Sequence, residues 1–314
     1  MTSPGVAELR DITHVLGDTR SLLCREEVLM ALVTEQARRL DQFHEQGYFI
    51  LREVFAPDVL SGARSALNRL VDRQAQELVV SGLVESTLEH EPFETRLYQL
   101  YRNCLDQAPD NWRPELHLPE LYPVFFHPFL LDHVSALLGT EVRLYPNYTV
   151  RPKLPDHPQT LVLWHQDGGY TEHWHKSREG DVSQLGMVNI WTPFVPARKA
   201  NGCMQFLPGT HLAGLLPHVQ REFYLEIPAG ALEPYRDKVI DIELDPGDVV
   251  VFHNMLCHRG LPNQTNSIRW SMDWRYQDAR QPTLRDEQGH LARSAKTPEH
   301  VVQDPDDWAR RRFS

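Results

Sequence analysis

WHQDGGY, residues Trp164–Tyr170, is the stretch on which the interpretation of this chain depends. Within it, His165 and Asp167 stand two residues apart at the end of an apolar run. Because side chains two positions apart on an extended strand point to the same face, we expect the imidazole and the carboxylate to aim at one point. The pair predicts part of a divalent-metal site that a second histidine would complete. Two histidines and one carboxylate with open positions are typical of non-haem Fe(II) and oxygen chemistry.

From about residue 141 the sequence changes to short β-rich runs separated by proline, glycine and asparagine. Several short strands between such turn signals indicate a sandwich or a barrel. The expected strands are Glu141–Val150, Thr160–His165, Leu185–Phe194, Cys203–Leu207, Lys238–Leu244, Asp248–His253 and Ile268–Tyr276.

The first part of the chain has helical patterns instead. Apolar residues at helical spacing predict helices over residues 26–45, from Pro57 onward and over 128–138, with a strand at Gly47–Leu51. We therefore expect a mainly β protein with a helical layer, an α+β arrangement. We interpret residues 1–314 as one domain, divided into a mainly helical N-terminal layer (1–140), a β core (141–280) and a C-terminal tail (281–314).

The length and charge of the chain limit its class. A chain of 314 residues needs no metal to hold its core, so a metal here is expected to be functional. With 32 basic and 43 acidic residues the formal net charge is −11, which argues against binding to nucleic acid or to a membrane surface. The acidic balance also argues weakly against a substrate that carries several negative charges, such as a coenzyme A thioester.

The cysteines and the hydropathy pattern indicate where in the cell the protein is expected. The four cysteines Cys24, Cys104, Cys203 and Cys257 form no C-x-x-C pair, which favours reduced thiols. The N-terminal residues show no apolar segment of the signal-peptide type, and no run reaches the ~18 apolar residues of a spanning helix. We expect a soluble, cytoplasmic protein, and the pattern makes no prediction of its oligomeric state.

Three downstream histidines are candidates for the third ligand. His253 and His258 are five residues apart, and an odd spacing on a regular strand places them on opposite faces. His211 follows a turn. These residues alone leave the choice among the three open.

Arg269 adds a second kind of evidence. It lies eleven residues after His258, at the start of the next expected strand, so a hairpin would bring it beside the strand of His258. A guanidinium holds a carboxylate through two parallel hydrogen bonds. A metal with a carboxylate-binding arginine is what a 2-oxoglutarate site requires, because the keto-acid end chelates iron and the distal carboxylate needs a cation.

Further segments follow the first one in a fixed order over residues 140–276. They are IWTP (Ile190–Pro193), NGCMQFLPGTH (Asn201–His211), PGDVVVFH (Pro246–His253) and the pair His258 and Arg269. With WHQD (Trp164–Asp167), this arrangement resembles the phytanoyl-CoA dioxygenase (PhyH-like) family of Fe(II)- and 2-oxoglutarate-dependent oxygenases. The resemblance implies a double-stranded β-helix core, of the jelly-roll or cupin-like kind, flanked by N-terminal helices.

The resemblance also assigns the metal site. It implies that His165, Asp167 and His258 are the iron ligands and catalytic residues, and that Arg269 binds the distal carboxylate of 2-oxoglutarate. We then interpret His253 as a structural histidine and His211 as a hydrogen-bonding loop residue.

Other contacts follow from the same resemblance. Trp191 matches a tryptophan beside the co-substrate, and Thr149 or Asn147 is a further contact. Gly260 departs from the family, which often has a serine there that hydrogen-bonds the co-substrate.

Residues after the His-x-Asp pair are candidates for the substrate pocket. Tyr170 and Trp174 follow closely enough to line it, and the polar stretch Thr171–Gln184 is expected to form a lid over the metal. His173 and His175 lie in this stretch and are either substrate contacts or surface residues.

The implied reaction is hydroxylation of an aliphatic C–H bond of a small metabolite or natural product. O2 is consumed, and succinate and CO2 are released. Related halogenases replace the carboxylate ligand by glycine or alanine, so Asp167 favours hydroxylation over halogenation. Desaturation or cyclisation with the same ligands, a non-oxidative cupin-type metal enzyme and a catalytically silent ligand-binding member remain as alternatives.

Overall fold

The computed structural model describes residues 34–174 and 181–312. Residues 43–314 form one compact unit, whereas residues 1–42 form a separate unit of which only 34–42 are described. The helix expected over 26–45 is seen in its described part, since residues 34–46 are helical. The interpretation of 1–314 as one domain stays a prediction.

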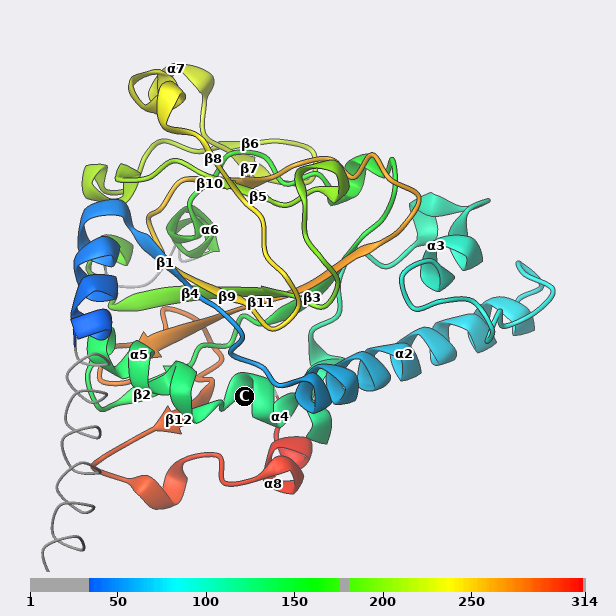
Figure 1. The fold of residues 1–314 in the computed structure, drawn as a ribbon, viewed down its shortest axis with the longest axis horizontal. Helices are drawn as coiled ribbons and strands as arrows, with labels where there is room; N and C mark the ends of the chain where they lie inside the picture. Colours follow the sequence, from blue (N-terminus) through cyan, green and yellow to red (C-terminus); the bar gives the residue numbers. More distant parts are fainter. Residues whose placement is uncertain (1–33, 175–180, 313–314) are drawn as a thin grey trace, which may run out of the picture. The chain divides into compact units, whose positions relative to one another are not determined.

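The β core consists of two main antiparallel sheets (Figure 1). The strands are β1 (Tyr48–Leu51), β2 (Val142–Leu144), β3 (Thr149–Lys153), β4 (Met187–Pro193), β5 (Met204–Phe206), β6 (Val219–Gln220), β7 (Leu225–Glu226), β8 (Ile240–Ile242), β9 (Val249–His253), β10 (His258–Gly260), β11 (Arg269–Asp278) and β12 (His290–Arg293). The larger sheet has seven strands in the order β1-β9-β4-β11-β2-β12, with β3 also paired to β11. The smaller sheet has the order β10-β5-β8, and β6 pairs with β7. This confirms the predicted jelly-roll class, and β1 and β12 extend the main sheet beyond residues 141–280.

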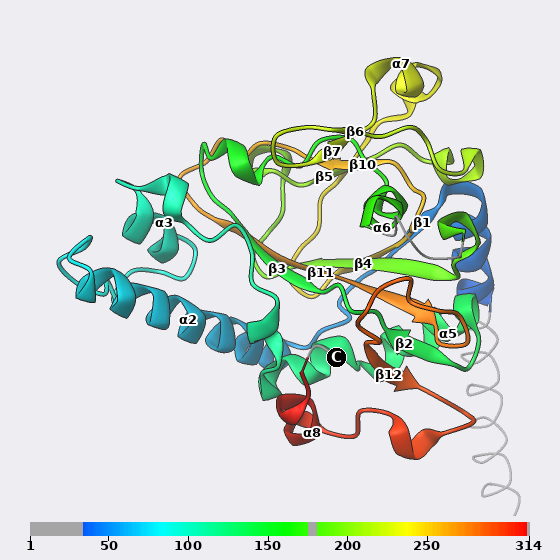
Figure 2. The same ribbon diagram turned by 180° about the vertical axis from the view of Figure 1, so that it is seen from behind.

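Helices α2 (Pro57–Val80), α4 (Tyr122–Phe125), α5 (Pro128–Leu138) and α8 (Pro305–Arg310) lie on the face of the seven-stranded sheet that is turned away from the smaller sheet (Figures 1 and 2). The other helices are α3 (Arg96–Tyr101), α6 (Asp167–Trp174), which lies on the side of the smaller sheet, and α7 (Ala229–Leu232), which lies beyond the smaller sheet. Helix α2 begins with a proline in its first turn and buries Ala63, Leu67 and Leu70 at helical spacing, as expected from the sequence. Helix α5 has the predicted bounds.

The side chains of strand β11 alternate between the hydrophobic core and a polar cavity on the other face of the sheet. Trp270, Met272 and Trp274 are buried in the hydrophobic core shared with the helices. Arg269 and Arg275 alternate with them and line a cavity on the opposite face. Because successive strand residues point to opposite faces, one strand supplies both the core and the wall of a polar cavity.

Three local expectations differ from the structure. Residues 160–165 are not a strand. Pro158–Thr160 is a 3-10 helix, and the backbone hydrogen bonds from the following residues to β10 are made by Val162 and His165, whose spacing of three does not continue a ladder. The expected hairpin between the strands of His258 and Arg269 does not exist either, because β10 and β11 belong to different sheets. The expected strand over 141–150 is split around Pro146, which has no N–H to donate.

Among the described residues, no single helix is long and apolar enough to span a membrane, although the bent pair Pro119–Phe125 and Pro128–Leu138 meets the criterion of length and composition. Cys104, Cys203 and Cys257 are free thiols. Cys24 lies outside the described residues.

The C-terminal tail docks on the helical layer through Trp308. This side chain is fully buried, with its ring 4.3 Å from that of His117 and 5.2 Å from that of Phe125. Its indole N–H donates to the carbonyl oxygen of Leu116 at 3.1 Å. The tail is therefore part of the hydrophobic core.

We expect Trp308→Ala to lower the free energy of unfolding by about 3–5 kcal/mol, because it removes a large buried ring and leaves a cavity. Chemical denaturation measures this change. Leu212→Ala is the control, since Leu212 is 72% exposed and its loss should change stability by no more than about 0.5 kcal/mol. Equal stability of both variants would contradict the core role of the tail.

Candidate active site

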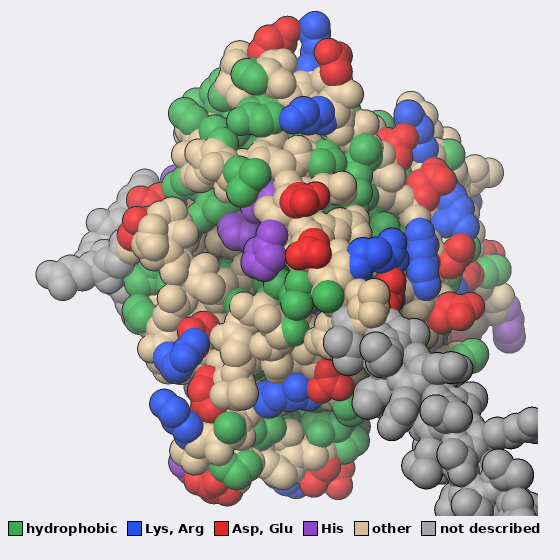
Figure 3. All heavy atoms as spheres, turned by 60° about the vertical axis from the view of Figure 1, so that its left-hand side comes forward, with side chains coloured by type: hydrophobic (Ala, Val, Ile, Leu, Met, Phe, Trp, Pro, Cys, Tyr) green, Lys and Arg blue, Asp and Glu red, His purple; other side chains and the backbone are tan. Residues whose placement is uncertain are grey.

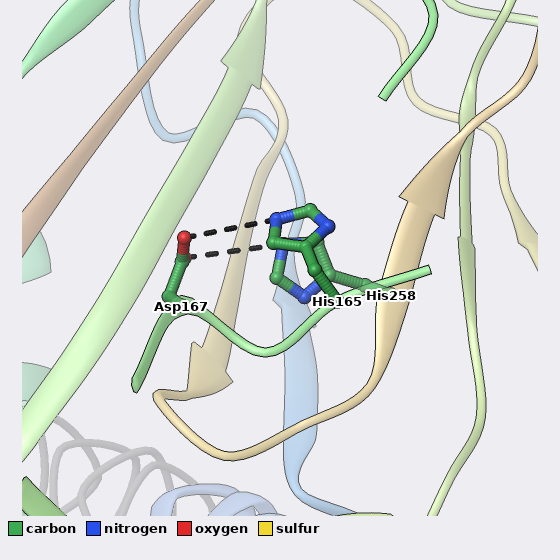
Figure 4. Close-up of side chains that lie close together, drawn as sticks. All are labelled: His165, Asp167 and His258. Atoms are coloured by element: carbon green, nitrogen blue, oxygen red, sulfur yellow. Dashed lines mark ion pairs between the residues drawn. The ribbon is translucent and has the colours of Figure 1, made fainter. Parts of the chain in front are cut away.

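His165, Asp167 and His258 converge on one point, with one ligand atom from each within 4.8 Å of the others. Nε2 of His165 lies 3.8 Å from Oδ1 of Asp167, and Nε2 of His258 lies 3.9 Å from Oδ2. Figure 4 shows both rings facing the carboxylate. In the part of the chain that the structure describes, no other group of three or more histidine, cysteine or acidic side chains has metal-binding geometry.

The backbone positions these groups in two different ways. His165 and His258 exchange both of their backbone hydrogen bonds, at 3.0 and 2.9 Å, in an isolated antiparallel bridge that places the two rings side by side. Asp167 is the first residue of α6, so the expectation that it shares a strand face with His165 is wrong. Gly168, the second residue of this helix, packs against Met255, since a Cβ there would lie 2.6 Å from its Sδ.

Both histidines are oriented for metal binding by a backbone carbonyl. Nδ1 of His165 lies 2.8 Å from the oxygen of Leu163, and Nδ1 of His258 lies 2.9 Å from that of Leu256. A carbonyl oxygen only accepts, so Nδ1 carries the proton and Nε2 keeps its lone pair for a metal. Burial lowers the pKa of His165 to about 3 and also lowers the pKa of His258, which keeps both rings neutral.

Arg275 holds the carboxylate of Asp167, a contact that the sequence did not reveal. Its Nη2 donates to Oδ1 of Asp167 at 2.6 Å, and its Nη1 donates to the Thr171 hydroxyl at 3.3 Å. With its amide oxygen turned toward Arg275, Asn147 accepts from both Nη atoms. Burial acts to raise the pKa of Asp167, but Arg275 and then the two histidines hold it at about 2. The carboxylate is thus ionised, and Oδ2 is left for a metal.

Arg269 is a buried cation with unused hydrogen-bonding capacity. It is 5% exposed, and its Nε and Nη1 have no hydrogen-bond partner among the described residues. Its guanidinium lies 5.3 Å from the ring centre of Trp191. Burial lowers its pKa to about 10. Buried polar groups are nearly always hydrogen-bonded, so these atoms fit an anionic ligand.

Lys153 lies beside Arg269 and was not singled out from the sequence. The two residues are register partners on β3 and β11. Lys153 is 2% exposed, and its Nζ donates to the carbonyl oxygen of Thr160 at 2.7 Å. A Cβ on Gly260 would lie 3.2 Å from this Nζ, and a Cβ on Gly202 would lie 2.6 Å from Cε. The lysine thus fills space next to the position where the family often has a serine.

A cavity of about 360 Å³ joins these groups. The predicted site residues in its wall are His165, Asp167, Tyr170, Trp191, His258 and Arg269. Tyr170 lies with its ring 5.2 Å from that of His165, and its hydroxyl accepts from the N–H of Leu225 at 3.1 Å. The side chain of Trp174, together with His175, lies outside the described residues, so the lid over 171–184 stays a prediction.

The remaining candidates have local partners. The Thr149 hydroxyl is buried and accepts from Nε of Arg113 at 2.8 Å, whereas Asn147 lines the cavity. Nδ1 of His253 accepts from the N–H of Met255 at 3.0 Å. Nε2 of His211 lies 3.1 Å from the carbonyl oxygen of His44. Neither His253 nor His211 takes part in the metal-ligand cluster.

A family model described as phytanoyl-CoA dioxygenase (PhyH) matches residues 43–271. The chain belongs to the phytanoyl-CoA dioxygenase family. The 1-deoxypentalenic acid 11-beta-hydroxylase of Streptomyces arenae is 28% identical over 254 residues, covering 76% of this chain and 81% of that protein. The human peroxisomal phytanoyl-CoA dioxygenase is 23% identical, covering 76% and 67%. The resemblance stated from the sequence and the enzyme class of dioxygenase are confirmed.

Solved structures share the fold. EctD from S. alaskensis, solved with 2-oxoglutarate and 5-hydroxyectoine, superposes with a TM-score of 0.55 at 18% identity and covers 88% of this chain and 84% of its own. The epimerase SnoN, solved with Fe3+, alpha-ketoglutarate and nogalamycin RO, has a TM-score of 0.53 at 18% identity and covers 80% and 87%.

We expect Arg275→Met to weaken metal binding by about 10–100-fold, the usual effect of removing a group that orients a ligand. Anaerobic titration with Fe(II) measures this. Arg280→Met is the control, because Arg280 is 60% exposed and pairs with Asp278 at the end of the same strand. Unchanged affinity in the Arg275 variant would show that Asp167 needs no support.

Proposed function

We propose that this chain is an Fe(II)- and 2-oxoglutarate-dependent dioxygenase that hydroxylates an aliphatic C–H bond of a small metabolite or natural product. O2 is consumed, and succinate and CO2 are released. One observation carries the proposal: a cavity contains both a two-histidine, one-carboxylate cluster and a buried arginine with two unpartnered nitrogen atoms.

The residues fit iron and its co-substrate. Two neutral imidazoles and one carboxylate suit Fe(II) and leave positions for other ligands. When bound, iron and 2-oxoglutarate supply the O2-dependent oxidation. His165, Asp167 and His258 would hold the metal, and Arg269 would bind the distal carboxylate with Trp191 beside it. Thr149 would support this wall of the cavity.

Relatives indicate the kind of substrate. The names of the similar hydroxylases and solved complexes include 1-deoxypentalenic acid, nogalamycin RO and 5-hydroxyectoine, all of them small molecules. We infer a substrate of this size for the present chain, with Tyr170 and Trp174 as its contacts. Asp167 retains the carboxylate ligand, which favours hydroxylation.

Lys153 would provide a second cation for the co-substrate. Its Nζ lies 3.2 Å from where a Cβ at residue 260 would be, and the lysine neighbours Arg269 across the ladder. Burial, followed by the charge of Arg269, lowers the pKa of Lys153 well below its usual value, and a bound dianion would favour its charged form. This assignment accounts for the absence of the family serine at Gly260.

Anaerobic addition of Fe(II) and 2-oxoglutarate is expected to give the weak visible charge-transfer band of such complexes, followed by succinate formation when O2 is admitted. His165→Ala should abolish the band by removing a metal ligand. Arg269→Ala should leave Fe(II) binding intact and raise the Kd for 2-oxoglutarate at least tenfold, since a charge-assisted bond contributes about 1.5–3 kcal/mol. No band in folded, iron-loaded protein would refute the proposal, and unchanged co-substrate affinity would refute the role of Arg269.

Lys153→Met is expected to raise the Kd for 2-oxoglutarate by about 10–100-fold, because the distal carboxylate loses one of two cations. Calorimetric titration with 2-oxoglutarate measures this. The matched control is Lys199→Met, at a lysine that is 68% exposed and pairs with Asp241. If both variants bind 2-oxoglutarate as the parent chain does, Lys153 has only a packing role.

A further inference from the structure

The cavity carries more positive charge than iron and 2-oxoglutarate require. Its described basic residues are Arg113, Arg151, Lys153, Arg259, Arg269, Arg275 and Arg285, and its acidic residues are Asp110, Asp167 and Asp273. The whole chain has a net charge of −11, and acidic and basic side chains are interspersed on the face shown in Figure 3. Positive charge is thus concentrated at the ligand site itself.

Six of these seven cations have a partner or an assigned role. Arg269 and Lys153 are assigned to the co-substrate, and the guanidinium of Arg285 lies 5.6 Å from the ring centre of Tyr145. Arg275 holds Asp167, and Arg151 donates to Oδ2 of Asp273 at 2.9 Å. Arg259 lies 4.8 Å from the ring centre of Trp164 and donates to a glutamine side chain. The two charges of Fe(II) balance those of 2-oxoglutarate, so an excess of positive charge remains for another ligand.

Arg113 is the cation best placed to meet that ligand. The preceding residue, Trp112, exchanges both backbone hydrogen bonds with Val150 of β3, at 3.0 and 3.1 Å, which fixes Arg113 at the cavity wall. Its Nε donates to the Thr149 hydroxyl at 2.8 Å, so the guanidinium is oriented through one edge. Among the described residues, the carboxylate of Glu115 accepts only from the backbone N–H of Arg113, at 3.2 Å, and no hydrogen bond joins the guanidinium to a carboxylate.

The surroundings of Arg113 favour an anion of single charge. Burial, and then the neighbouring charge of Arg151, lowers the pKa of Arg113 to about 10, which an anionic ligand would reverse. Asp110 and Asp273 line the same cavity and reduce the positive charge that a ligand meets there, which favours one negative charge over two. A guanidinium matches a carboxylate through two parallel hydrogen bonds.

We propose that Arg113 binds a carboxylate group of the substrate, at a subsite separate from the Arg269 subsite of 2-oxoglutarate. This inference rests on the proposed function and names a substrate class for it: small carboxylic acids. Thr149 is then a positioning residue for Arg113. The expectation from the net charge, that an anionic ligand is disfavoured, does not hold for the cavity.

The test uses cyclohexanecarboxylate and its neutral counterpart cyclohexanecarboxamide as probes, titrated calorimetrically into the anaerobic Fe(II) and 2-oxoglutarate complex. The acid is expected to bind about tenfold or more tightly than the amide. Arg113→Met should reduce this preference to less than about twofold while the visible band persists, and Arg113→Lys should retain part of it. Equal binding of the two probes, or failure of the acid to bind, would overturn the proposal.

Arg259→Met is the matched control, since it removes one positive charge from the same cavity. The Arg259 variant should keep the preference for the acid over the amide. If the Arg259 and Arg113 variants lose this preference equally, only the total charge of the cavity matters, and the proposed subsite is overturned. Inorganic phosphate serves as a third probe, and tighter binding of phosphate than of the acid would also overturn it. The titration is repeated without iron and 2-oxoglutarate, so that the preference for the acid is also measured when the visible band is missing. A missing band in the iron-loaded protein counts only against the proposed function, whereas a missing preference for the acid counts only against the Arg113 subsite.

Discussion

The alternation of β11 is the constraint on which both the fold and the site depend. One face of this strand contributes Trp270 and Trp274 to the core shared with the helices. The other face carries Arg269, Asp273 and Arg275 into the wall of the cavity, where a buried unpaired charge is unfavourable. Asp273 and Arg275 are paired within the protein. Arg269 retains unpartnered nitrogen atoms. Because buried polar groups are nearly always hydrogen-bonded, these atoms point to a ligand.

The sequence predicted a candidate site whose three metal-ligand residues the structure brings together, but part of the expected geometry was incorrect. Strand parity was applied to His165 and Asp167, although the carboxylate stands at the start of a helix. Likewise, Arg269 reaches the site from the sheet opposite His258 and not along a hairpin. Local patterns identify elements well, but which sheet an element joins depends on pairings between distant segments. A usable signal existed for Arg275, whose even spacing from Arg269 places both on one strand face.

Average properties of the sequence were less informative than the arrangement of its residues. The helices from Pro57 and over 128–138, and most strands, followed from periodicity, because each buries a regular apolar face. The net charge of −11 gave no indication of a cationic cavity. A buried lysine such as Lys153 is equally hidden from such reasoning, since lysine is ordinarily a surface residue.

The contact between Lys153 and two glycines has an evolutionary consequence. Gly202 has a positive φ of +87° and lies against Cδ and Cε of the lysine, and Gly260 lies against its Nζ. A larger residue at either position competes with the lysine for one volume, so substitutions at these three sites are coupled and non-additive. Exchange of a hydroxyl at position 260 for an ammonium at position 153 is thus a pair of coupled changes, because a Cβ at position 260 would lie 3.2 Å from Nζ of the lysine.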